Sequence, residues 1–136
     1  MSDEVFLDSG PIVAWRVKRD RHHCRARETF ESLAFHGTAY ITSTDILDEA
    51  VTLVRKGAGF RAGRRLWEDL SSGGLAIVRS VSDSVRADAW AVFLRHEHLN
   101  FSVTDCTSLA LMRRYGMKRI FTFDGAFRRA GVTVVP

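Results

Sequence analysis

Short runs of apolar residues alternate along this chain with longer segments in which apolar residues recur at helical intervals. The short runs indicate buried strands, because parallel strands that are covered on both faces read as nearly continuous apolar stretches. The predicted strands span residues 5–7, 39–41, 75–78, 119–122 and 132–135.

The segments between these runs are long enough to form helices. Asp8 and Ser9 precede the first segment as candidate N-cap residues, and Pro11 falls in its first turn, where proline is well tolerated. The predicted helices span residues 11–19, 27–35, 44–55, 62–70, 84–94 and 107–115. Glycines that would end three of the helices as C-caps are Gly37, Gly57 and Gly116.

Strands that alternate with helices predict a parallel sheet whose right-handed crossovers place helices on both faces. The expected fold class is therefore α/β, with a three-layer α/β/α arrangement around a central parallel sheet. The chain of 136 residues shows no internal repeat, low-complexity segment or linker, and it fits one core. The sequence therefore predicts a single domain over residues 1–136.

The composition agrees with a packed globular protein. Hydrophobic residues make up 46% of the chain and charged residues 26%, which excludes an intrinsically disordered segment. The two cysteines, Cys24 and Cys106, are too few for a disulfide framework and lack the spacing of a zinc site. Neither a secretory signal pattern nor an apolar run of membrane-spanning length is present, so we expect a reducing, cytoplasmic location.

Acidic residues follow several of the predicted strands. Asp8 comes directly after strand 5–7, and Asp124 follows strand 119–122. Asp105 precedes the helix predicted at 107–115, and Glu49 lies on the helix that follows the second strand. In open parallel sheets, ligands bind beyond the carboxyl ends of the strands, so these four positions are the first candidates for a functional site.

Each acid also has a structural interpretation. Asp8 and Asp105 are typical helix caps, and Asp124 is typical of a simple turn. Glu49 could be an ordinary exposed helix residue, and a shift of one position would exchange it for Asp48.

Taken together, the four acids indicate a cation site. Four carboxylates at one edge of a sheet would repel one another at neutral pH and raise one another's pKa values, which a bound cation would offset. Oxygen ligands without sulfur suit hard divalent ions such as Mg²⁺ or Mn²⁺, which commonly bridge carboxylates to phosphate oxygens. Hydrolysis of phosphodiester bonds is the natural chemistry of such a site.

These acidic segments also resemble those of a known family. The segments 5–9, 42–49, 102–108 and 121–127 look like the successive acidic motifs of PIN domains, and the resemblance is closest to VapC-type ribonuclease toxins. It spans nearly the whole chain. No single segment is specific, but their order, spacing and position relative to the strands form a strong joint signal.

The resemblance implies a metal-dependent endoribonuclease, in which Mg²⁺ or Mn²⁺ positions and activates a water for in-line attack on RNA without a covalent protein nucleophile. Glu49 would then bind the metal directly, bind it through water, or act as a base. The hydroxyls of Ser9 and Thr104 resemble supporting polar residues, although helix capping explains them equally well. The implied catalytic and metal-binding residues are Asp8, Glu49, Asp105 and Asp124.

The basic residues are compatible with an RNA partner. Lys and Arg number 20 against 16 Asp and Glu, for a net charge of +4, and most of the basic residues fall within 16–27, 55–65 and 113–129. Such clusters favour phosphate contacts, but they are also typical of solvated helix faces. The paired histidines at 22–23 are more typical of a surface than of a metal site.

The resemblance further implies two protein partners, a small antitoxin and a second copy of the chain that brings two acidic sites to one groove. Apolar residues that could form the dimer interface, or instead complete the monomer core, are Phe60, Leu66, Trp67 and Leu70. For Trp15, Trp67 and Trp90, packing in the core or at an interface is favoured over base stacking.

Two other functions are compatible with acids at strand ends. A PIN-like module that binds RNA or a partner without catalysis would keep the fold, but the four intact acids disfavour it. A phosphoryl-accepting receiver domain needs an acidic pair after its first strand, and Asp8 is followed there by Ser9 and Gly10.

Overall fold

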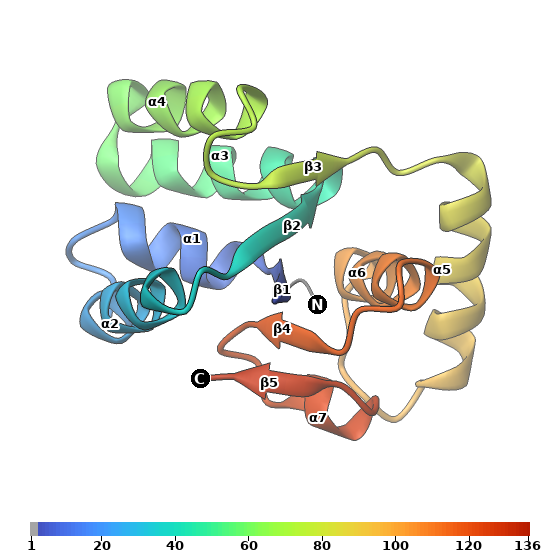
Figure 1. Ribbon diagram of the computed structural model, residues 1–136. Helices are drawn as coiled ribbons and strands as arrows, with labels where there is room; N and C mark the ends of the chain where they lie inside the picture. The colour runs from blue at the N-terminus through green and yellow to red at the C-terminus, as the bar shows by residue number, and fades with distance from the viewer. Residues whose placement is uncertain (1–2) are drawn as a thin grey trace.

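The computed structural model describes residues 3–136, so the first two residues of the predicted domain lie outside the described part. A sheet of five parallel strands runs through the centre of the molecule in the order β3-β2-β1-β4-β5 (Figure 1). The strands are β1 (Glu4–Leu7), β2 (Ala39–Ser43), β3 (Ile77–Arg79), β4 (Arg119–Phe121) and β5 (Thr133–Val135). All five agree with the predicted strands to within about two residues at each end.

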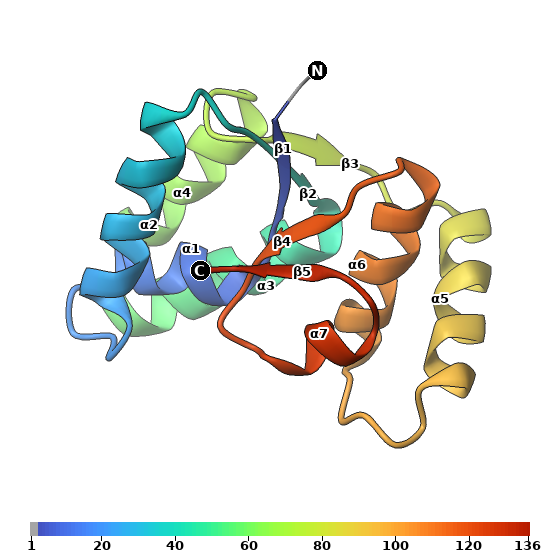
Figure 2. The ribbon, with the colours of Figure 1, turned by 60° about the horizontal axis from the view of Figure 1, so that its bottom comes forward.

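Helices cover both faces of the sheet. Figure 2 shows α1, α2 and α4 on one side and α5 and α6 on the other. Within these layers α1 packs on α2 and α3, α3 packs on α4, and α5 packs on α6. The helices are α1 (Ser9–Arg16), α2 (His23–Phe35), α3 (Thr44–Ala58), α4 (Phe60–Ser71), α5 (Asp83–Arg95), α6 (Val103–Arg114) and α7 (Ala126–Arg129). The three-layer α/β/α prediction is therefore confirmed.

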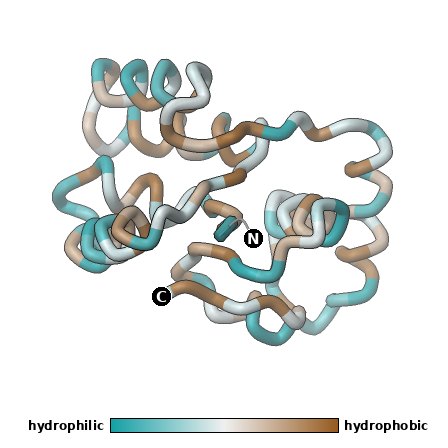
Figure 3. The backbone as a smooth tube through the Cα atoms, viewed as in Figure 1, coloured by the Kyte–Doolittle hydropathy of each residue, from teal (hydrophilic) through white to brown (hydrophobic). Residues whose placement is uncertain are grey.

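The apolar runs of the sequence form the core. Phe6 and Leu7 of β1, together with Ile120 and Phe121 of β4, are fully buried in the middle of the sheet. The hydropathy colouring in Figure 3 shows apolar segments along the strands and on one side of several helices. Both faces of these strands are covered, which explains why their sequences show no alternation of apolar and polar residues.

The strand order reverses between β1 and β4, which in parallel sheets defines the crevice at the carboxyl ends of the two strands. The chain builds β1, β2 and β3 outward in one direction and then returns to place β4 and β5 on the other side of β1. Leu7 pairs with Phe121, so β1 and β4 end side by side at the point where the order reverses. In parallel α/β sheets this is the position at which ligands bind.

One predicted C-cap is wrong. Gly57 lies inside α3, where an added Cβ would stand 3.1 Å from a methyl group of Val17, so the glycine permits close packing against the end of α1. The helix ends instead at Gly59, whose φ of +98° is open to glycine but strained for other residues. Gly37 and Gly116, which follow α2 and α6 with positive φ, confirm the other two predictions.

Several helix limits also differ from the prediction. The helix predicted at 107–115 begins at Val103, because the hydroxyl of Ser102 caps its first turn. The short helix α7 was not predicted. None of the helices formed by residues 3–136 is long and apolar enough to cross a membrane.

The apolar residues considered for a dimer interface divide into two groups. Leu66 and Leu70 are buried in the monomer core, whereas Phe60 and Trp67 on the same helix are more than half exposed. Of the other two tryptophans, Trp15 packs against Phe30 and Trp90 is exposed.

Candidate active site

Asp8 lies at the end of β1 and caps α1. Its Oδ1 accepts a hydrogen bond of 2.9 Å from the backbone N–H of Ser9, and its Oδ2 accepts one of 2.7 Å from the hydroxyl of Thr122. The residue is only 8% exposed. The pKa of Asp8 is raised to about 6, chiefly by burial and to a smaller extent by the charges of Asp105 and Glu49, while the two hydrogen bonds lower it.

Asp124 is exposed and follows β4. Its backbone N–H donates to the hydroxyl of Thr122 at 3.0 Å, and its Oδ1 accepts a hydrogen bond of 2.9 Å from the N–H of Ala126. Thr122 itself is 2% exposed. This buried hydroxyl therefore donates to Asp8 and accepts from Asp124, which ties the ends of β1 and β4 together.

Asp105 is the third residue of α6 and forms a capping box with Ser102. The N–H of Ser102 donates to Oδ2 of Asp105 at 2.9 Å, and the N–H of Asp105 donates to the Ser102 hydroxyl at 3.0 Å. Burial raises the pKa of Asp105, the hydrogen bonds from Ser102 oppose this rise, and the charge of Asp124 adds to it. Asp105 thus serves the helix and also faces the other acids.

Glu49 projects from the middle of α3. Burial raises its pKa, a hydrogen bond from the Ser9 side chain lowers it, and the charges of Asp105 and Asp45 raise it. Glu49 is the carboxylate of this helix whose charge reaches both Asp8 and Asp105, which favours it over Asp48 as a site residue.

The four predicted acids lie near enough to one another for their charges to interact in pairs. The charge of Asp8 couples to Glu49 and to Asp105, Glu49 couples to Asp105, and Asp105 couples to Asp124. The capping interpretation is confirmed for Asp8, which is the N-cap of α1, and Asp105 contributes to the capping box of α6, whereas the role of both residues as metal ligands stays a prediction. The hydroxyls of Ser9 and Thr104 do not cap these helices, because the N-cap residue of α1 is Asp8 and that of α6 is Ser102.

The carboxylate oxygens of the four acids and the hydroxyl of Thr122 are oxygen donors of the kind that suits a hard cation. In the conformation described for residues 3–136, however, no three acidic, histidine or cysteine side chains are arranged to hold a metal ion. Asp8, Asp105 and Asp124 each turn an oxygen to a local backbone N–H.

Two features of the site were not predicted from the sequence. The first is Thr122, whose role depends on the pairing of β1 with β4. The second is an ion pair at the edge of the site, where Arg86 of α5 donates to Asp45 of α3 at 3.0 Å and to the hydroxyl of Thr107 at 3.3 Å. Neither has a local sequence signal, because each joins residues far apart in the chain.

The chain matches a known family, because the PIN domain family model aligns with residues 5–132. The chain belongs to the PIN domain family, as its acidic motifs suggested.

Among individual proteins, the chain is similar to the 23S rRNA-specific endonuclease VapC20 of Mycobacterium tuberculosis. The two are 28% identical over 131 residues, which cover 96% of this chain and 97% of that protein. The crystal structure of VapC20, described as a sarcin–ricin loop cleaving toxin, superposes with a TM-score of 0.84 at 27% identity over 95% of this chain and 96% of that one.

More distant structures share the fold. VapBC2 from Rickettsia felis, bound to a DNA fragment from its promoter, matches with a TM-score of 0.68 at 13% identity and covers 97% of both chains. FitAcB from Neisseria gonorrhoeae matches with a TM-score of 0.62 at 18% identity, over 97% of this chain and 96% of that one.

Proposed function

We propose that this protein is a metal-dependent endoribonuclease that hydrolyses RNA phosphodiester bonds and acts as the toxin of a VapC-type toxin–antitoxin pair. The observation that carries this proposal is the coupling of four carboxylates, Asp8, Glu49, Asp105 and Asp124, at the crevice between β1 and β4. The match to VapC20 over nearly the full length of both chains supports it.

In this proposal Asp8, Asp105 and Asp124 hold Mg²⁺ or Mn²⁺ with their carboxylate oxygens. When bound, the cation supplies a Lewis acid for a phosphoryl oxygen and lowers the pKa of an attacking water. Thr122 keeps Asp8 oriented through their hydrogen bond. Glu49 lies on α3. It completes the ligand set directly or through water, or it accepts a proton from the attacking water.

The name of VapC20 suggests the first substrate to test. VapC20 is described as specific for 23S rRNA and as cleaving the sarcin–ricin loop. We propose an RNA of the same class for this chain, and with it an action in the cytoplasm, where ribosomal RNA is found.

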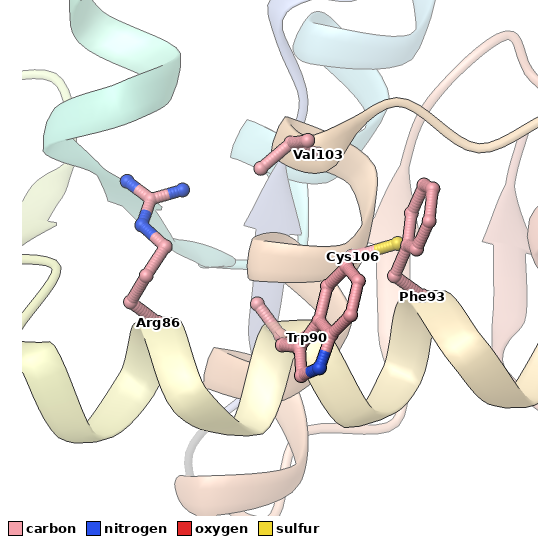
Figure 4. Close-up of a pocket in the computed structure, with 6 residues that line it drawn as sticks. Arg86, Trp90, Phe93, Val103 and Cys106 are labelled. Atoms are coloured by element: carbon pink, nitrogen blue, oxygen red, sulfur yellow. The ribbon is translucent and has the colours of Figure 1, made fainter.

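We also propose a small antitoxin and a second copy of the chain as partners. Two exposed apolar surfaces are available for them. On α4, Phe60 and Trp67 border a hollow against α3. On α5, the stacked rings of Trp90 and Phe93 line a second hollow with Val103 of α6 (Figure 4). Surfaces of this kind commonly mark protein interfaces.

The direct test is cleavage of defined RNAs, including a sarcin–ricin loop hairpin, by the purified protein with Mg²⁺ or Mn²⁺ and with a chelator. We expect metal-dependent cleavage that Asp8→Asn and Asp105→Asn abolish while the far-UV circular dichroism stays unchanged. Activity that persists in both variants would overturn the proposal. RNA binding without cleavage by the wild type would favour the alternative, a non-catalytic RNA- or partner-binding module.

A further inference from the structure

An acidic crevice repels the phosphates of the RNA that it is proposed to cut. Four carboxylates at one edge create a negative potential, and a bound divalent cation offsets only part of it. The nucleotides that flank the cleaved bond therefore need cationic side chains nearby. The position of these cations shows over which side of the crevice the RNA strand passes.

On the α5 side, Arg86 is already paired with a carboxylate. Arg86 forms a salt bridge of 3.0 Å with Asp45 and also donates to the buried hydroxyl of Thr107. A guanidinium that is held by a carboxylate has less charge to offer a phosphate. This side of the crevice is therefore poorly suited to hold the RNA backbone.

On the opposite side, Phe123 extends the crevice toward α2. Its ring lies over the first turn of α1, because a Cβ added at Gly10 would stand 3.9 Å from its Cδ2. The imidazole of His22 stacks on the Phe123 ring with 4.5 Å between centroids and 22° between planes. The guanidinium of Arg25 lies over the same ring at 5.6 Å. Phe123, the residue before Asp124, thus contacts two residues at the start of α2, His22 and Arg25.

A second guanidinium, that of Arg21, contacts the stack, and a third, that of Arg128, lies at the turn that follows Phe123 and Asp124. Arg21 donates from Nε to Nε2 of His22 at 3.2 Å. Arg128 of α7 places Nη1 within 3.2 Å of the position of a Cβ on Gly125, the residue after Asp124. All three arginines, Arg21, Arg25 and Arg128, are exposed, and within residues 3–136 none of them forms a salt bridge.

We propose that Arg21, Arg25 and Arg128, arranged around the His22–Phe123 stack, form a basic strip that binds the phosphate backbone of the substrate RNA beside the acidic crevice. This proposal rests on the proposed nuclease function and names the side from which the RNA is held. Guanidinium groups suit the role, since their planar donors match phosphate oxygens and remain charged at all relevant pH values. Unpaired arginines also need no partner to be displaced before RNA binds.

The test compares two double variants that remove the same charge. Arg25→Gln/Arg128→Gln alters the strip, and Arg61→Gln/Arg65→Gln removes two exposed arginines of α4 that likewise form no salt bridge within the described chain. Figure 1 shows α4 at the opposite end of the molecule from β4 and β5. Binding of a labelled single-stranded RNA of about 12 nucleotides is followed by fluorescence anisotropy in a chelator over a range of salt concentrations. Gel analysis checks that the RNA stays intact.

The strip variant is expected to bind on the order of tenfold more weakly in 0.1 M salt, and its salt slope is expected to fall by about 0.7 for each phosphate that the missing arginines no longer neutralise. The α4 variant is expected to keep the wild-type slope. If the two variants changed RNA affinity and its salt slope equally, or if neither changed them, the proposal of a basic strip would be overturned. Cleavage distinguishes the two proposals. A wild type that shows this binding but cuts no RNA contradicts the nuclease alone, whereas wild-type KM in the strip variant contradicts the strip alone.

Discussion

The hydroxyl of Thr122 donates a hydrogen bond of 2.7 Å to the carboxylate of Asp8, and both groups are buried. The two residues follow neighbouring strands, so this bond holds a proposed metal ligand in place at the point where the strand order reverses. It also lowers the pKa of Asp8 against the effect of burial.

Removing this hydroxyl is expected to impair catalysis beyond its effect on stability. In Thr122→Val, Asp8 loses a donor and its pKa rises further, so a smaller fraction of the carboxyl group is ionised near neutral pH. We expect RNA cleavage to fall about tenfold or more, and the pH at which it is half maximal to move upward. Rates measured between pH 5 and 9 test this.

Thr122→Ser is the matched control, because it keeps the hydroxyl and loses only a methyl group. Its pH profile is expected to follow the wild type. If the serine and valine variants lost activity equally, packing by the threonine methyl group would explain the effect and the hydrogen bond would not.

The raised pKa of Asp8 predicts an unusual pH dependence of stability. Because the folded pKa of about 6 lies above the ordinary value of 3.8, the folded state binds the proton more tightly than the unfolded state does. The protonated Asp8 therefore makes its full contribution to the free energy of unfolding below about pH 4. That contribution is lost as the pH rises through 6, which lowers the free energy of unfolding by about 3 kcal/mol.

Asp8→Asn removes this cost, since an uncharged amide of similar shape takes the place of the carboxylate. In a chelator at pH 7 the variant is expected to melt at a higher temperature than the wild type, and the difference is expected to shrink toward pH 4. Melting curves of both proteins between pH 4 and 8 provide the measurement. A variant that is less stable than the wild type at pH 7 would contradict the charge cost.

Metal binding is expected to stabilise the wild type. A divalent ion at about 100 times its Kd adds about 2.7 kcal/mol to the free energy of unfolding, which corresponds to about 10 °C for a domain of this size. Mn²⁺ is the appropriate probe, with melting followed at pH 7.5. Protons compete for the same carboxylates, so the shift is expected to be smaller at pH 5.

Asp105→Asn serves as the comparison for this experiment, since it removes one proposed ligand and keeps an acceptor for the N–H of Ser102. Its melting temperature is expected to respond weakly to Mn²⁺. An equal rise in both proteins would locate the metal elsewhere on the chain.

The sequence was informative about the fold where the signal is local. The capping role of Asp8 and the buried runs of β1 and β4 depend on neighbouring residues, and each was predicted. The four acids could be proposed as one site because parallel strands carry their carboxyl ends to the same edge of the sheet. The predicted parallel topology thus allowed four acids, each weak evidence alone, to be predicted as one site.

The sequence was less informative where contacts join distant segments. The hydrogen bond from Thr122 to Asp8 depends on the pairing of β1 with β4, and Gly57 looked like a helix end because its contact with Val17 is tertiary. The convergence of side chains on a metal depends on rotamers, which periodicity does not encode. The metal ligands accordingly remain a proposal.

The ion pair between Arg86 and Asp45 predicts a compensating pair of substitutions. The charge of Asp45 raises the pKa of Glu49. Arg86 lies 3.0 Å from the carboxylate of Asp45 and offsets that charge. Arg86→Gln leaves Asp45 uncompensated, so the pKa of Glu49 is expected to rise further and the acid limb of the pH profile of RNA cleavage to move to higher pH. Asp45→Asn in the same background removes the repulsion, so the double variant is expected to regain most of the activity and the acid limb of the pH profile.

Cleavage rates of the wild type, the two single variants and the double variant form a complete double-mutant cycle. Additive losses in the double variant would show that Arg86 acts through some contact other than Asp45, such as its hydrogen bond to Thr107.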